Sequence, residues 1–147
     1  MKSAIFLSIF LLASFVSVAQ ERTITGKVID ETDLSPMPDV KIQNRDTVLL
    51  GTTDKDGVFK IRLAADTDEL LLSFIGMEWT SVKVPSDCSH VEIIMMVDAI
   101  YDYTTPRIEN KKRHKRFKQI PEKHRQAHRN GIFISDSPCG IYLFQNH

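Results

Sequence analysis

Short segments in which apolar and polar residues alternate, each ended by turn-forming residues, most strongly constrain the fold of this chain. In the clearest segment Phe59, Ile61 and Leu63 share one face of an extended strand. Asp56 and Gly57 precede it and tolerate the positive φ that a tight hairpin turn requires. Strands are predicted at residues 23–29, 40–44, 48–53, 58–63, 70–75, 79–84 and 91–97. Because no helical period interrupts these seven segments, they predict an all-β sandwich.

The segment at residues 70–75 differs from the others because it is apolar at almost every position. A strand that buries both of its faces has this pattern, whereas a strand with one wet face alternates. We therefore expect residues 70–75 to form a central strand that is covered on both sides.

Four segments resemble, in order and spacing, a carboxypeptidase regulatory-like domain. They are ITGKV at 24–28, PMPDV at 36–40, GTTDKDGVF at 51–59 and LSFIGM at 72–77. The resemblance covers residues 22–97 and implies a single immunoglobulin-like (Ig-like), transthyretin-like β-sandwich of about seven strands. That family is common at the N-terminus of TonB-dependent outer-membrane receptors of Gram-negative bacteria. The chain has Asp39 where the family usually has glycine and Met77 where it has an aromatic residue. No receptor plug or barrel follows Met96, so the resemblance does not imply the receptors' transport function.

The N-terminus has the order of a secretory signal peptide. Lys2 precedes an apolar run over residues 4–16, and small residues follow up to Ala19. We predict a signal peptide over residues 1–19 and a mature chain that begins at Gln20. A retained membrane anchor is the alternative, but the run is shorter than the ~20 residues that a spanning helix needs. The protein is therefore expected to be exported to the periplasm or the cell surface, and to be peripheral to the membrane at most.

The mature chain is predicted to have two parts that differ in charge: a β-sandwich over residues 20–98 and a basic C-terminal extension over residues 99–147. Residues 20–106 carry 8 Lys and Arg against 16 Asp and Glu, whereas residues 107–129 carry 10 against 2. The densest run contains Lys111, Lys112, Arg113, Lys115, Arg116 and Lys118. Such a basic patch is a candidate site for anionic lipid or glycan, and export makes nucleic acid an unsuitable partner. The alternative is a solvated, partly disordered tail held near the acidic body.

The C-terminal extension also regains apolar character at residues 132–134 and 141–144. Turn residues separate the two segments, so a closing hairpin is predicted. It would add strands to the edge of the sandwich or pair with a partner by β-augmentation, and we expect docking on its own body.

Cys88 and Cys139 are the two cysteines of the chain. Export to an oxidising compartment favours a disulfide that would pin the last segment to the body. Two free thiols remain the alternative, because the sequence does not give the distance between them. A nucleophilic Cys139 beside a histidine would make the chain a small hydrolase, but a disulfide accounts for this residue more simply.

The remaining candidate sites lack parts of the motifs to which they are similar. Asp54 and Asp56 have the opening spacing of a calcium loop, but no glutamate stands at its twelfth position. His124 and His128 would share a helix face, with His114 as a third ligand, but the hydrolytic glutamate between them is missing. We therefore predict no catalytic residue, no metal and no cofactor.

The leading hypothesis is an exported, non-enzymatic binding or scaffolding module of the bacterial cell envelope. Its partner would be an envelope protein, a glycan or an anionic surface. The alternative is a structural tether that adheres to anionic lipid or glycan through the basic extension.

Overall fold

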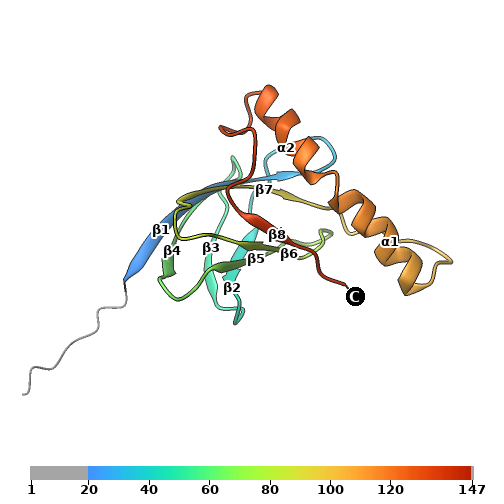
Figure 1. Ribbon diagram of the computed structural model, residues 1–147, viewed down its shortest axis with the longest axis horizontal. Coiled ribbons are helices and arrows are strands. Elements are labelled where there is room, and N and C mark those ends of the chain that lie inside the picture. The colour runs from blue at the N-terminus through green and yellow to red at the C-terminus, as the bar shows by residue number, and fades with distance from the viewer. Residues whose placement is uncertain (1–19, 147) are drawn as a thin grey trace, which may run out of the picture.

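The computed structural model describes residues 20–146, and the signal peptide predicted for residues 1–19 lies outside them (Figure 1). The elements within this part of the chain are β1 Glu21–Asp30, β2 Lys41–Asn44, β3 Leu49–Thr52, β4 Val58–Ala64, β5 Glu69–Ser73, β6 Thr80–Lys83, β7 His90–Met95, α1 Pro106–Phe117, α2 Ile120–Arg129 and β8 Ile141–Leu143. Each of the seven predicted strands overlaps one of the strands β1 to β7.

The strands form two sheets that face each other. One sheet has the order β4-β1-β7 and the other has the order β3-β2-β5-β6-β8. The β1–β7 pair is parallel, and the other pairs are antiparallel. The main hydrophobic core lies between the sheets and includes Ile24, Val28, Ile42, Phe59, Ile61, Leu63, Leu70, Leu72, Val91, Ile93 and Met95. The fold is therefore a mostly β, sandwich-like domain.

Two glycines are required by the packing of β1 and β4. A Cβ on Gly26 would lie 2.3 Å from the carbonyl oxygen of Val91 and 2.5 Å from the Phe59 ring, so only glycine lets both approach β1. Gly57 has a φ of 71°, as the predicted turn requires. The Asp54 carboxylate accepts the backbone N–H groups of Asp56 and Val58, both at 2.9 Å. Asp54, the first candidate calcium ligand, therefore closes a turn.

The all-β prediction is wrong for the C-terminal extension, which contains α1 and α2 (Figure 1). A second core packs α2, the last residue of α1 and the following loop against the outer face of the three-stranded sheet. It contains Ile29, Leu34, Ile94, Met96, Ile120, Ala127 and Phe133. Strand β7 is therefore buried on both faces, because odd-numbered residues such as Ile93 face the main core and even-numbered ones such as Ile94 face the second core.

The expectation that residues 70–75 bury both faces is wrong. Strand β5 is central in its sheet, and Leu70 and Leu72 are fully buried. Its other face is only half-buried at Leu71, since neither helix within residues 20–146 covers that side of the sheet. Ile75 lies beyond the strand and is 95% exposed.

The closing hairpin is also not formed as predicted. Residues 141–143 form β8, which pairs with β6 and adds a strand to the edge of the five-stranded sheet. Residues 132–134 form no strand, because Phe133 packs into the second core and the Ile134 N–H is bound by the Glu92 carboxylate. Neither helix within residues 20–146 is long and apolar enough to cross a membrane.

Candidate functional site

Helix α1 is held on the sandwich by arginines rather than by an apolar face. Arg113 is buried and donates from Nε and Nη2 to the two carboxylate oxygens of Glu78, at 3.0 and 2.8 Å. Its Nη1 donates to Asn110 Oδ1 at 2.9 Å and to the carbonyl oxygen of Gln145 at 3.1 Å. This bidentate pair fixes the rotation of α1 about its axis.

Arg116, one turn further along α1, makes a second ion pair. Its Nη2 binds the carboxylate of Glu31 and donates to the Val97 carbonyl oxygen at 2.8 Å, and its Nη1 donates to Tyr101 Oη at 3.2 Å. Partial burial lowers the pKa of Arg116 from its ordinary value. Arg113 and Arg116 are thus structural parts of the interface between α1 and the acidic body.

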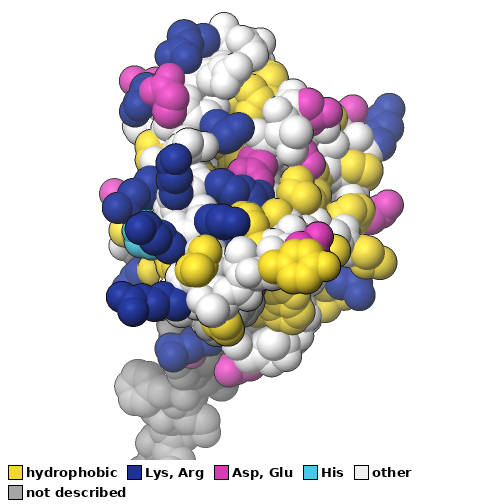
Figure 2. Space-filling view, turned by 90° about the vertical axis from the view of Figure 1, so that its right-hand side faces the viewer, with side chains coloured by type: hydrophobic (Ala, Val, Ile, Leu, Met, Phe, Trp, Pro, Cys, Tyr) yellow, Lys and Arg dark blue, Asp and Glu magenta, His cyan; other side chains and the backbone are white. Residues whose placement is uncertain are grey.

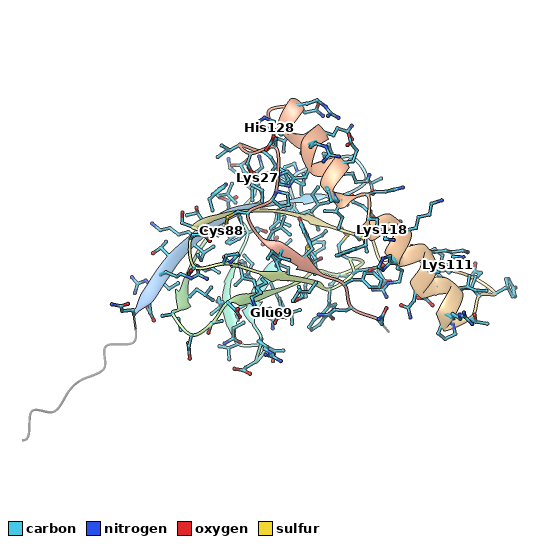
Figure 3. All side chains as sticks on the ribbon, in the orientation of Figure 1. Lys27, Glu69, Cys88, Lys111, Lys118 and His128 are labelled. Atoms are coloured by element: carbon cyan, nitrogen blue, oxygen red, sulfur yellow. A yellow bond between two sulfur atoms is a disulfide. The ribbon has the colours of Figure 1, made fainter. Side chains whose placement is uncertain are left out.

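The predicted basic patch of six residues is therefore divided, and its lysines remain on the surface. Lys111, Lys115 and Lys118 are exposed on the side of α1 opposite the inward arginines, and Lys112 is exposed on the flank of the helix beside Tyr101. Figure 3 labels Lys111 and Lys118 at the two ends of this row. No ion pair engages any of the four among residues 20–146. We call these four residues the lysine face.

Exposed apolar side chains lie in the two loops at the same end of the molecule. Ile75 and Trp79, in and just after the β5–β6 turn, are 95% and 54% exposed. Ile100 and Tyr103, in the loop between β7 and α1, are 89% and 108% exposed. A shallow groove beside them is lined by Asp39, Lys41, Ser73, Phe74, Met77 and Asp98. We call Ile75, Trp79, Ile100 and Tyr103 the apolar rim.

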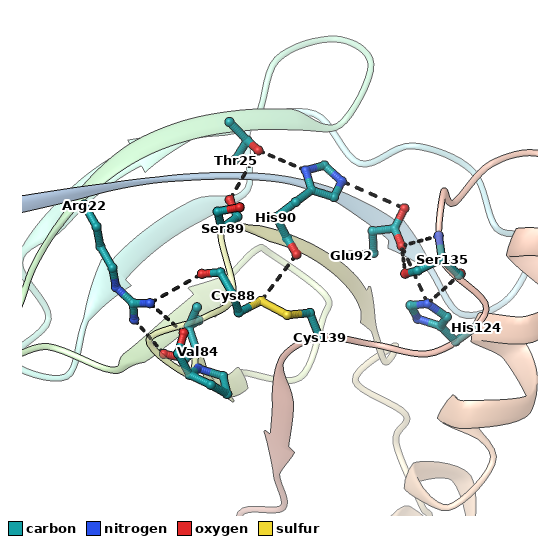
Figure 4. The surroundings of a disulfide bond; sticks show 11 residues. Arg22, Thr25, Val84, Cys88, Ser89, His90, Glu92, His124, Ser135 and Cys139 are labelled. Carbon is teal, nitrogen blue, oxygen red and sulfur yellow. Dashed lines mark hydrogen bonds and ion pairs between the residues drawn. A yellow bond between two sulfur atoms is a disulfide. The ribbon is translucent and has the colours of Figure 1, made fainter.

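A buried carboxylate fastens the loop after α2 to β7 (Figure 4). Glu92 is 4% exposed, and its oxygens accept the N–H groups of Ile134 and Ser135 and the Ser135 hydroxyl, the last at 2.6 Å. His124 Nε2 donates to the Ser135 carbonyl oxygen at 3.1 Å and lies 3.7 Å from a Glu92 oxygen. The Ser135 hydroxyl bonds the carboxylate and not the imidazole, so this cluster anchors a loop rather than activating a nucleophile.

His124 is fully buried in α2, and its Nδ1 has no hydrogen-bond partner among the described residues. Since a carbonyl oxygen only accepts, the Nε2 that contacts Ser135 carries the proton of the neutral ring. A second proton would place an unpaired N–H in the core. Burial lowers the pKa of His124 below its ordinary value of 6.5, against the opposing effects of the Glu92 and Asp136 carboxylates.

We expect the free energy of unfolding to fall as the pH drops from about 7.5 to about 5.5, because the unfolded chain takes up a proton that folded His124 resists. A lowered folded pKa gives stability that is present above pH 6.5 and lost below it, about 1.4 kcal/mol for each unit of lowering. Urea denaturation at both pH values measures the loss. His124→Gln keeps a donor to Ser135 and should flatten this dependence; an equally steep dependence in the variant would assign it to other groups.

The two cysteines form the disulfide that the sequence favoured. In this oxidised state Cys139 is not a free nucleophile. Cys88 and Cys139 are bonded, with Cα atoms 6.0 Å apart and a sequence separation of 51 (Figure 4). The bond joins the loop before β7 to the segment before β8. Arg22 of β1 supports this loop by donating to the carbonyl oxygens of Val84 and Pro85, each at 2.6 Å.

The three candidate histidine ligands are not brought together. His124 is buried as described, His128 contacts the Phe133 carbonyl oxygen at 3.3 Å through Nδ1, and His114 packs edge-on against Phe144 at 4.8 Å. Within residues 20–146 no group of three or more histidine, cysteine or acidic side chains is placed to hold a metal ion.

The two sheets, their order and the second core define a β-sandwich module with a helical C-terminal extension. The family model of the CarboxypepD_reg-like domain matches residues 24–100, and the chain belongs to this family. The resemblance drawn from the four sequence segments is thereby confirmed. The helices, β8 and Cys139 lie beyond the matched residues.

Comparison with other proteins adds little to this assignment. No curated protein matches the chain. A chain of the E. coli P pilus tip assembly intermediate PapC-PapD-PapK-PapG is 14% identical, with a TM-score of 0.41 over 57% of this chain and 10% of that chain. The major plantain pollen allergen Pla l 1 is 13% identical, with a TM-score of 0.31 over 58% of this chain and 100% of the allergen. These low TM-scores support no conclusion about function.

Proposed function

We propose that the chain is an exported, non-enzymatic binding or scaffolding module of the bacterial cell envelope, resident in the periplasm or on the cell surface. The observation that carries the proposal is the contrast between its buried and exposed polar groups. The buried polar groups hold the C-terminal extension on the sandwich; they are Glu31, Glu78, Glu92, Arg113 and His124. The lysine face and the apolar rim are instead exposed and can contact a partner. Family membership and the disulfide support a binding domain in an oxidising compartment.

The second candidate function is a structural tether that adheres to an anionic surface. The exposure of Lys111, Lys112, Lys115 and Lys118 on one side of a firmly held helix favours it. Such a face presents a fixed array of cations, whereas the cations of a disordered tail would spread out.

A pull-down from native envelope extract distinguishes the two functions. The protein is compared at low and high salt with a variant in which the four residues of the lysine face are replaced by glutamine. A scaffold that binds a protein through its sandwich should capture the same protein with both baits at both salts. Capture only by the unchanged protein at low salt would support the tether, since screening weakens contacts between exposed charges. If neither bait retained any envelope component, the binding proposal would be wrong.

A further inference from the structure

We propose that the end of the molecule formed by the β5–β6 turn, the β7–α1 loop and α1 is a docking surface for an anionic phospholipid bilayer. The inference rests on the tethering function and names its partner. It assigns two separate contributions, attraction by the lysine face and insertion by the apolar rim. Figure 2 views this end of the molecule and shows cationic side chains gathered beside hydrophobic ones.

The lysine face has the geometry needed to meet a flat surface. Lys111, Lys115 and Lys118 follow one another at intervals of four and three residues, so they form a single stripe along α1. Ile108 begins the stripe and is 46% exposed. The helix cannot rotate this stripe away, because the buried Arg113 holds Glu78 on the opposite side. Cations near an anionic leaflet contribute additively to binding.

The apolar rim has the composition of an inserting edge. Ile75 and Ile100 are almost fully exposed although they are among the most water-averse side chains. Trp79 and Tyr103 combine a large apolar ring with a polar group, and both residue types are enriched at the boundary between lipid and water. Exposed apolar side chains that cluster in this way indicate an interaction surface.

Hydrogen bonds and ring contacts join the two parts into one surface. The Asp98 N–H donates to the Gly76 carbonyl oxygen at 2.9 Å, which ties the β7–α1 loop to the β5–β6 turn. Tyr101, in the same loop, lies under Lys112, with Nζ 5.1 Å from the ring centroid. The apolar rim therefore lies next to α1. Asp98 and Asp102 are also in this loop, which contains no Lys or Arg, so the loop itself adds no cationic attraction.

A bilayer matches this combination better than a glycan does. An acidic polysaccharide would bind the lysine face but would leave Ile75 and Ile100 in water. A bilayer accepts lysines at its headgroups and inserts apolar side chains a few ångströms below them, as interfacial helices do. The chemistry of the surface therefore favours a membrane whose outer layer carries phosphate groups.

Flotation with vesicles tests the inference. The protein is mixed with vesicles of phosphatidylcholine containing phosphatidylglycerol, or of phosphatidylcholine alone, and the bound fraction is measured. We expect binding to the anionic vesicles only. The double variant Lys111→Gln, Lys115→Gln should bind the anionic vesicles about tenfold more weakly or worse, because each lysine contributes about one kcal/mol to binding. Ile75→Ser with Ile100→Ser should weaken it about fivefold or more, since each isoleucine loses most of its transfer into the apolar layer.

Two matched controls have the same chemistry elsewhere on the molecule. Lys60→Gln with Arg62→Gln removes two exposed cations from β4, where they pair with Thr25 and Thr23. Val48→Ser with Leu49→Ser removes two exposed apolar side chains, each 57% exposed, at the opposite end of β5. Both controls should bind like the unchanged protein, and all the variants should keep its melting temperature.

Three outcomes would overturn the inference. In the first, all the variants bind the vesicles as well as the unchanged protein does. In the second, the two control variants lose as much binding as the lysine and isoleucine variants. In the third, only the lysine variant loses binding, which would indicate a simple polyanion site. Heparin added to the vesicles identifies that last case. Vesicle binding that is absent while the pull-down recovers a protein would reject the membrane partner and leave the binding function standing. Failure of both assays would reject the binding function itself.

Discussion

Arg113→Met should lower the free energy of unfolding by about 3–5 kcal/mol, because it leaves Glu78 buried without its bidentate partner. Both side chains of the pair are 5% exposed, so water cannot replace the lost bonds. Among the cationic groups of the described residues, Arg116 Nη1, 3.8 Å from Glu78, would be the one left near the carboxylate. Urea denaturation followed by the fluorescence of Trp79, the one tryptophan, measures the change.

The matched control for this variant is Arg125→Met. Arg125 pairs with Glu122, but their side chains are 52% and 59% exposed, and such surface pairs contribute about 0–1 kcal/mol. The double variant Arg113→Met, Glu78→Leu should recover much of the loss, because it removes the unpaired charge as well. If Arg113→Met and Arg125→Met were equally mild, the buried pair would not be what holds α1.

Removal of the disulfide should cost about 4 kcal/mol, because the bond closes a loop across a separation of 51 residues and so restricts the unfolded chain. Replacing both cysteines by serine, or reducing the bond, should lower the melting temperature and the denaturation midpoint together. The largest local loss of stability should be in the segment before β8, where backbone hydrogen exchange should become faster. Glu92 would still bind Ser135, so the extension should loosen rather than detach.

The serine variant also provides the control for the reduction experiment. A reducing agent should destabilise the unchanged protein and have no effect on the variant. If reduction left the melting temperature of the unchanged protein where it was, the closed loop would contribute nothing to stability.

The strands were predictable because each depends on local information. Alternation set the inward face of β4 at Phe59, Ile61 and Leu63, and the Asp56–Gly57 turn set its start. The nearly continuous apolar run at residues 70–75 wrongly predicted that this strand buries both of its faces. That property belongs to β7, and it depends on helices that are contributed by residues more than ten positions later.

The helices of the extension were not predicted because their buried side does not follow an apolar period. In α1 the inward positions include Arg113 and Arg116, whose partners Glu78 and Glu31 are 35 and 85 residues away in sequence. A basic run of this composition therefore has the pattern of a solvated tail. One signal was present: Glu78 and Glu92 are charges within apolar segments, and buried charges require partners.

The candidate site was predictable only in its composition. The basic run identified the lysine face but included two arginines that face inward. The apolar rim was missed entirely, because Ile75 and Trp79 belong to segments that predict strands, and only the structure places them beyond or at the end of a strand. Exposure depends on where a strand ends, and sequence patterns fix such ends poorly.

The parallel pairing of β1 with β7 determines the order in which the chain can fold. Thr25 of β1 lies opposite His90 of β7, 65 residues later in the sequence. Strand β1 can therefore complete its pairing only after β7 has been synthesised. Contacts of such long sequence separation form slowly, and we expect refolding on the millisecond to second scale rather than in microseconds. Until β7 arrives, β1 has one unpaired edge, which is a template for association with other chains. A chain shortened before residue 90 should therefore aggregate, although it would contain all four of the sequence segments that resemble the family.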